Sequence, residues 1–253
     1  ASIMKKVFRK FRRKKNHLEY SGPYKNWEEA IMSSVGYSSN VVLNKVETAT
    51  RNVLYGVSKY ERDGTNFNQL PELNTLLKHL ENLKPFNSKI LDVGGGLGSL
   101  FINYKVFFDD YEVKYTVLEQ ENFCDLGEII SEEFNLQIDF KRNISEIDTK
   151  EFDIVIMSST LQYFEDWKKF VNEIISIKPK HIFIDRHPLT NDDSKILVQL
   201  NTNYYDEEVT YPIHIINEKE FLTTFNNYKV ISSWYSDFDP KYFKGFHLFL
   251  DEN

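Results

Sequence analysis

The chain has 253 residues, of which 41% are hydrophobic and 15% aromatic, a composition that excludes a disordered protein and allows one large folded domain with a small appendage. Its formal net charge of −7 argues against a nucleic-acid-binding surface, so we expect no nucleic acid partner. The single cysteine, Cys124, excludes an internal disulfide and a cysteine-rich zinc site, which favours a reducing, cytoplasmic location.

Residues 1–20 are predicted to form a basic arm. Eight Lys and Arg residues, and no acidic residue, lie between Lys5 and Lys15. Apolar residues recur beside these cations at helical spacing, so peripheral contact with an anionic membrane surface is one interpretation. A solvated or partner-binding arm is the simpler interpretation, and we favour it. No apolar run is long enough for a signal peptide or a membrane span.

Residues 21–86 are predicted to form a helical cap. Apolar residues at helical spacing predict helices at 28–32, 41–54 and 70–83, with breaks at Gly36 and Gly64.

Residues 87–253 are predicted to form an α/β domain. Short β-branched and aromatic runs alternate with helical patterns, which is typical of parallel βαβ units. The predicted strands are 89–93, 115–119, 137–141, 152–158, 181–186, 228–235 and 246–250. The segment between the last two has turn residues but no helical pattern, which predicts an antiparallel hairpin at the sheet edge. The sequence therefore predicts a seven-stranded, mostly parallel sheet.

The connection at about 186–216 is unusually long for a compact domain, so we expect a lid-like binding loop there. Ligands of open α/β sheets bind beyond the carboxyl ends of the strands, where Arg186 and His187 end the fifth strand. We select His187 as the leading general base, with His214 second, and Arg186 as a contact to the substrate. The aromatic residues of this connection predicted to bind substrate are Tyr204 and Tyr211.

A glycine-rich turn follows the predicted strand 89–93. Asp92 precedes its glycines, which are Gly94, Gly95, Gly96 and Gly98. Glycines allow a sharp turn and a close approach of the backbone to a ligand. The next strand ends in Glu119, about 20 residues later, where a carboxylate can bind both hydroxyls of a ribose. The loop, Asp92, Glu119 and the adjacent Gln120 are therefore predicted to bind an adenosine-containing cofactor.

This order of acidic residue, glycines and strand-end carboxylate resembles the signature of class I S-adenosylmethionine-dependent methyltransferases. The dinucleotide pattern G-x-G-x-x-G fits less cleanly, because Ser99 and Leu97 stand where it requires glycine. The resemblance implies a Rossmann-like class I methyltransferase fold, S-adenosylmethionine as cofactor and S-adenosylhomocysteine as product. The run 152–163 resembles the fourth-strand motif of the same superfamily, which implies a cofactor contact for Ser158 and substrate contacts for Gln162 and Tyr163.

Several stretches also resemble a group of methyltransferases associated with bacterial surface-polysaccharide gene clusters. They are Trp27-Glu28 with Gly36-Tyr37, Tyr60 to Gly64, the glycine loop, Ser158 to Tyr163, Ile184 to Arg186 with Pro188, and Tyr211-Pro212. The resemblance implies a small-molecule or nucleotide-linked glycan as acceptor, methylated at a sugar hydroxyl or at a phosphate or phosphoramidate oxygen. Tyr60 and Arg62 are predicted to contact the cofactor, Arg62 through its planar guanidinium.

Two alternatives stay open. A nucleotide-sugar oxidoreductase or epimerase would need a Tyr-x-x-x-Lys pair, but Trp167 follows Tyr163 and Phe246 follows Tyr242 at that spacing. The other alternative is a scaffold that binds S-adenosylmethionine without catalysis. No metal site is predicted, because no His and carboxylate residues show ligand spacing. The sequence leaves the oligomeric state open.

Overall fold

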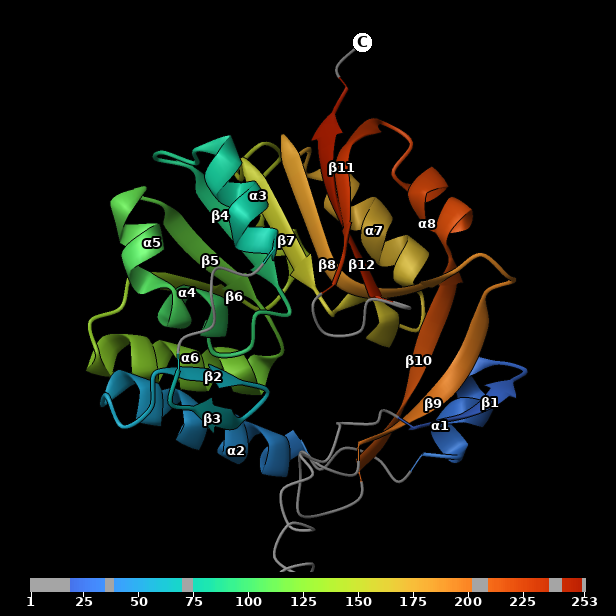
Figure 1. Cartoon of the computed structure of the whole chain (residues 1–253), viewed down its shortest axis with the longest axis horizontal. Coiled ribbons are helices and arrows are strands. Elements are labelled where there is room, and N and C mark those ends of the chain that lie inside the picture. Colours follow the sequence, from blue (N-terminus) through green and yellow to red (C-terminus); the bar gives the residue numbers. More distant parts are fainter. Residues whose placement is uncertain (1–18, 35–38, 70–74, 202–208, 237–242, 252–253) are drawn as a thin grey trace, which may run out of the picture.

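The computed structural model of the chain describes residues 19–34, 39–69, 75–201, 209–236 and 243–251 (Figure 1). Tyr204 and nearly all of the predicted basic arm lie outside these ranges.

The strands expected from the sequence form the centre of the molecule, in the order β6-β5-β4-β7-β8-β12-β11. They are β4 (Lys89–Val93), β5 (Lys114–Leu118), β6 (Ile138–Lys141), β7 (Ile154–Ser158), β8 (His181–Thr190), β11 (Tyr228–Tyr235) and β12 (Phe243–Leu250). Strands β4 to β8 are parallel, whereas β12 is antiparallel to β8 and to β11. The prediction of five parallel strands followed by an antiparallel hairpin is confirmed.

Three further strands extend this sheet from the end of β8. They are β1 (Glu19–Tyr24), β9 (Lys195–Asn201) and β10 (Val209–Asn217), which pair antiparallel in the order β1-β9-β10. Strand β10 joins β8 through two parallel pairs at Leu189 and Thr190. The predicted lid-like loop at 186–216 is therefore wrong in its described part, because its backbone groups pair in a sheet. The predicted boundary of the arm at residue 20 falls inside β1.

The segment before the parallel sheet contains the three predicted helices, α1 (Trp27–Met32), α2 (Ser39–Leu54) and α3 (Thr75–Leu83). The break at Gly64 is a hairpin of β2 (Tyr60–Arg62) and β3 (Thr65–Phe67), so the cap is not helical throughout. The remaining helices are α4 (Ser99–Asn103), α5 (Lys105–Asp110), α6 (Glu121–Glu133), α7 (Trp167–Ser176) and α8 (Glu218–Thr224), with short 3-10 turns η1 (Ile144–Glu146) and η2 (Leu161–Tyr163).

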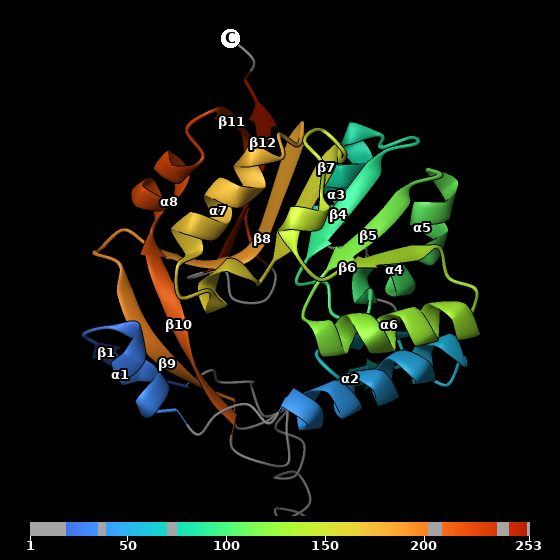
Figure 2. The ribbon, with the colours of Figure 1, turned by 180° about the vertical axis from the view of Figure 1, so that it is seen from behind.

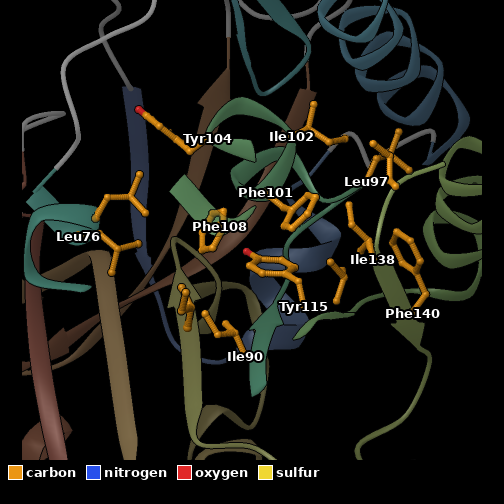
Figure 3. Packing of buried hydrophobic residues seen from close by; sticks show 14 of the residues in the cluster. Leu76, Ile90, Leu97, Phe101, Ile102, Tyr104, Phe108, Tyr115, Ile138 and Phe140 are labelled. Carbon is orange, nitrogen blue, oxygen red and sulfur yellow. The ribbon is translucent and has the colours of Figure 1, made fainter. Parts of the chain in front are cut away.

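The parallel strands are buried on both faces, and a separate core packs on each. One core joins strand residues such as Tyr115 to α3, α4, α5 and α6, with the rings of Phe101 and Phe108 around Tyr115 (Figure 3). The other contains Trp167 of α7 and Phe221 of α8. Figure 2, seen from behind, shows α7 on the opposite side of the sheet from α3. The carboxyl ends of the strands are left to form a site.

Among the described residues, none of the helices combines the length and the apolar character that crossing a bilayer requires.

Candidate functional site

The glycine turn after β4 depends on glycine for its backbone and for its packing. Gly94, Gly96 and Gly98 have φ of 71°, 59° and 84°, a region that side chains disfavour. A Cβ at Gly94 would lie 2.7 Å from Thr160, and one at Gly98 would lie 2.7 Å from Ile138. A Cβ at Gly96 would meet no atom within 4 Å. The turn is thus packed at its two ends and accessible at its middle.

Asp92 lies beneath this turn rather than on its surface. Its side chain is only 4% exposed and accepts a hydrogen bond from the Tyr115 hydroxyl at 2.7 Å. A Cβ at Gly95 would lie 2.5 Å from the Asp92 carboxylate, so the turn rests on it. Burial raises the Asp92 pKa to about 6, against the opposing effect of the Tyr115 hydrogen bond. Asp92 therefore supports the turn from below.

Glu119 joins the end of β5 to the glycine turn. Its Oε2 accepts from the Gly96 backbone N–H at 3.2 Å, and its Oε1 accepts from the Gln120 N–H at 2.9 Å. Burial raises its pKa, and these two hydrogen bonds oppose the shift. Gln120 itself precedes α6 with an exposed side chain. The predicted carboxylate and the predicted glycine turn are therefore in direct contact.

Ser158, the last residue of β7, meets Arg186, which lies within β8 just past the last pair of these two strands. Arg186 Nε donates to Ser158 Oγ at 3.1 Å. Burial by itself lowers the Arg186 pKa, but the charges of Asp63 and Asp185 more than offset it, so the pKa is raised. Arg186 is a non-glycine residue with φ of 50°. The guanidinium is thus charged and held at the end of β7.

Tyrosines from two other elements lie near this guanidinium. Tyr60 of the β2–β3 hairpin and Tyr163 of η2 are both close enough to raise the pKa of Arg186. Burial raises the pKa of the Tyr60 phenol. Tyr163 is 39% exposed, and its ring lies 5.2 Å from that of Tyr211, centroid to centroid. The structure therefore brings the β2–β3 hairpin and the turn η2 that follows β7 close to Arg186, and β10 borders them through Tyr211.

Arg62, the other predicted cofactor contact of the hairpin, lies half-buried on β2. The hairpin is fixed to α4, because the Asn103 side chain accepts from the Glu61 N–H and donates to the Glu61 carbonyl. Since α4 begins directly after the glycine turn, Arg62 is held on the turn's side of the domain.

The side chains of His187 and Gln162 are both buried. His187 is 1% exposed, its ring stacks on Phe221 at 4.6 Å, and its Nδ1 lies 3.2 Å from Gln162 Oε1. Burial lowers the His187 pKa to about 3. The Gln162 amide donates to Ser159 Oγ at 2.8 Å. This environment does not suit a general base at His187 or a substrate contact at Gln162, because β8 turns the His187 side chain and η2 turns the Gln162 side chain into the protein interior.

His214 and Tyr211 lie on β10, outside the parallel sheet. The His214 ring stacks on Trp27 at 4.6 Å, and its Nε2 lies 3.1 Å from the Glu165 carbonyl. Burial lowers the His214 pKa. The Tyr211 hydroxyl accepts from Gln199 at 2.8 Å. The predicted base at His214 is thus held in a contact between α1 and β10, whereas Tyr211 borders the Arg186 site through Tyr163.

Two residues that support the site were not predicted. Thr160 Oγ1 donates to the Val93 carbonyl at 2.9 Å, which fixes the β7 turn against the glycine turn. The Tyr115 hydroxyl holds Asp92. Each contact joins segments that are far apart in the sequence, so no local sequence pattern marks it. In the part of the chain that the structure describes, no group of three or more His, Cys, Asp or Glu residues is arranged to hold a metal ion.

The arrangement of this chain matches known proteins. A family model described as methionine biosynthesis protein MetW matches residues 75–185, less than half of the chain. No curated protein is similar enough to count as a match. Among solved structures, the PH0226 protein of Pyrococcus horikoshii OT3 has a TM-score of 0.51 at 11% identity, over 70% of this chain and 88% of that one.

Two solved methyltransferases are equally similar. An S-adenosylmethionine-dependent methyltransferase from Clostridium acetobutylicum ATCC 824 has a TM-score of 0.50 at 9% identity, over 69% of this chain and 89% of that one. The glycopeptide N-methyltransferase MtfA, solved in complex with S-adenosylmethionine, has a TM-score of 0.51 at 10% identity, over 70% and 93%. The chain has the class I methyltransferase fold.

The predicted Rossmann-like class I methyltransferase fold is confirmed. At identities of 9–11%, these likenesses establish the fold alone. In this fold the glycine turn of our chain ends a central strand and Glu119 ends its neighbour.

Proposed function

We propose that the chain is an S-adenosylmethionine-dependent methyltransferase whose acceptor is a component of a surface polysaccharide or its nucleotide-linked precursor. The observation that carries the proposal is the hydrogen bond from the Gly96 N–H to Glu119, at 3.2 Å, across the ends of β4 and β5. It brings a strand-end carboxylate and a glycine turn to one edge of the sheet. A nucleoside with an amino acid end requires both features.

The residues at this edge fit such a cofactor. Each Glu119 oxygen accepts one backbone hydrogen bond and keeps a further lone pair, so the carboxylate is oriented and can still accept from two ribose hydroxyls. No atom within 4 Å would meet a Cβ at Gly96, so a ligand can approach the backbone there closely. Glu119 would hold the ribose, and the turn from Gly94 to Gly98 would hold the amino acid end.

When bound, S-adenosylmethionine supplies a methyl group on a positively charged sulfur. The main task of the chain is then to hold the acceptor atom about 3 Å from the methyl carbon and in line with the breaking bond. Arg186 in β8 and Tyr163 in η2, which follows β7, are the proposed acceptor-side residues. His187 is a poor base for this task, because it is buried and its pKa is about 3. An acceptor oxygen that is already ionised suits the site better than a neutral hydroxyl.

The acceptor class rests on the resemblance to methyltransferases of surface-polysaccharide gene clusters. Two of the stretches that carry this resemblance supply side chains to one site; they are Tyr60 to Gly64 and Ile184 to Arg186. Tyr60 and Asp63 of the first stretch both raise the pKa of Arg186 in the second. That two separate stretches of the resemblance meet around one guanidinium supports a shared role in acceptor binding.

Calorimetric titration with S-adenosylmethionine, S-adenosylhomocysteine and NAD tests the cofactor. We expect the first two to bind and NAD not to bind; a preference for NAD would refute the proposal. Transfer of labelled methyl groups to bacterial surface glycans and to nucleotide-activated sugars tests the acceptor. Cofactor binding without transfer to any of these acceptors would favour the scaffold alternative over this acceptor class.

A further inference from the structure

Arg186 occupies a bulge in strand β8. In β12, Phe246 pairs with Ile184 and Lys244 pairs with His187 of β8. One residue of β12 therefore lies opposite two residues of β8, Asp185 and Arg186, and the register shifts at this point. The φ of 50° at Arg186 falls at this extra residue. A bulge turns a side chain away from the direction that a regular strand would give it, and bulges are common beside active sites. The surrounding sheet therefore holds the Arg186 backbone in a strained conformation, and this conformation directs the guanidinium toward Ser158.

The side chain of Arg186 is only partly paired. Its Nε is fixed by Ser158, and within the described residues no carboxylate lies close enough for an ion pair with it. Asp63 and Asp185 lie farther from Arg186 but still raise its pKa. Arg186 is half-buried, so its charge is only partly hydrated and an anionic partner would stabilise it. With Nε held, the two terminal nitrogens form a planar fork that matches a phosphate or a carboxylate.

The position of Arg186 in the sheet separates it from the cofactor's ribose. Strands β4 and β7 lie between β8 and β5, the strand that Glu119 directly follows. At about 4.8 Å between neighbouring strands, the end of β5 and the Arg186 position of β8 are roughly 14 Å apart. A cofactor with its ribose at Glu119 and its amino acid end on the glycine turn occupies the ends of β5 and β4. The end of β7 and the Arg186 position of β8 are left to the acceptor.

We propose that Arg186 binds an anionic group of the methyl acceptor, a phosphate or a carboxylate, through the free fork of its guanidinium, with Tyr60 and Tyr163 beside it. This inference rests on the proposed methyltransferase function, because it assigns the acceptor side of that site. It narrows the substrate class to glycans or precursors that carry a negative charge next to the methylated atom. Ser158 is a positioning residue, since it acts by orienting Arg186.

Phosphate titration of the protein saturated with S-adenosylhomocysteine tests this assignment, at constant ionic strength maintained with chloride. The readout is the NMR signal of the Arg186 Nε–H group, identified by its loss in Arg186→Lys, together with calorimetry. We expect saturable binding of inorganic phosphate in the millimolar range. Arg186→Gln should abolish it, and Arg186→Lys should weaken it about tenfold, because lysine keeps the charge but not the fork.

Two further variants make the result specific. Ser158→Ala keeps the charge and removes only the Nε contact, so it should weaken phosphate binding several-fold even if an Arg186 variant fails to fold. Arg142→Gln, at a surface arginine paired with Asp125 and Glu128, should leave phosphate binding unchanged.

Affinity for S-adenosylhomocysteine separates the possible failures. In Arg186→Gln we expect it to stay within about twofold of wild type. If it falls at least tenfold while phosphate binding persists, Arg186 holds the cofactor and the inference is overturned. Unchanged phosphate binding in Arg186→Gln overturns it as well. A wild-type protein that binds no S-adenosylhomocysteine refutes the proposed function instead, and the same titration of the free protein then still reports on the anion site.

Discussion

Glu119 and Gly96 are joined by a hydrogen bond of 3.2 Å between a side-chain carboxylate and a backbone N–H. The bond ties the end of one strand to the turn that follows its neighbour. Because the carboxylate is held by backbone groups on two sides, its orientation is set before any ligand binds. We therefore expect the orientation of Glu119, which these backbone groups fix, to determine the affinity for the cofactor.

Replacing this carboxylate tests that link. Glu119→Gln keeps the shape of the side chain but removes the charge that strengthens hydrogen bonds to ribose hydroxyls, each worth about 1.5–3 kcal/mol. We expect S-adenosylhomocysteine to bind at least about tenfold more weakly, measured by calorimetry. The matched control is Glu121→Gln, two residues on in the exposed first turn of α6, which should bind as wild type does. Equal affinity in both variants would remove Glu119 from the site.

Gly96 offers a second test, because its environment has a close match elsewhere in the chain. Gly96 and Gly56 both have positive φ, 59° and 74°, and a Cβ on either would meet no atom within 4 Å. Alanine at each position should therefore cost a similar free energy of unfolding, about 1–2 kcal/mol, from backbone strain alone. Urea unfolding measures that cost. Only Gly96→Ala should also weaken cofactor binding, by more than tenfold, since only Gly96 lies beside Glu119. Similar cofactor affinity in the two variants contradicts the role given to the turn.

The parts of this site that lie on consecutive residues could be predicted from the sequence, as the glycine turn from Asp92 to Gly98 shows. Glu119 could be predicted as well, because parallel strands bring their carboxyl ends to one edge. Strands β9 and β10 were missed, since β9 pairs with β1 from the other end of the chain and local patterns carry no sign of that partner. The inward turn of His187 was missed for a related reason: it follows a bulge set by pairing with β12.

Glu61 leads to a prediction about stability and pH. It is 1% exposed, and neither carboxylate oxygen has a hydrogen-bond partner among the described residues, although Ser99 and Gly64 lie close by. Burial raises its pKa to about 7, which these neighbours only partly oppose. Because the folded-state pKa lies above that of the unfolded chain, near 4.5, ionisation of Glu61 destabilises the fold increasingly as the pH rises through this range.

Glu61→Gln removes this titration. We expect its stability relative to wild type to improve steadily between pH 4.5 and pH 7, and to level off at higher pH, in urea unfolding measured at several pH values. Glu28→Gln, which removes an exposed carboxylate of α1, is the matched control. A difference for Glu61→Gln that stays constant from pH 5 to pH 8 would mean that this carboxylate is not buried in its charged form.

Gly245 of β12 is predicted to be essential for the packing behind Arg186. A Cβ at this position would lie 2.1 Å from the Trp234 ring, which must therefore lie flat against the glycine. The same indole donates to Asp185 at 2.8 Å and stacks on His79 of α3 at 4.3 Å, so it connects the bulged strand to the cap.

Gly245→Ala should displace the Trp234 ring and cost about 1–3 kcal/mol of stability, the usual range for an overpacked core. Unfolding followed by Trp fluorescence checks this. Because Asp185 precedes Arg186, phosphate binding should weaken as well, whereas cofactor affinity should change little, since Glu119 lies on a different strand. The double variant Gly245→Ala with Trp234→Phe serves as the control: its smaller ring relieves the clash but lacks the N–H donor to Asp185. It should regain part of the stability but not the phosphate binding, and recovery of both would show that the Trp234 hydrogen bond has no part in aiming Arg186.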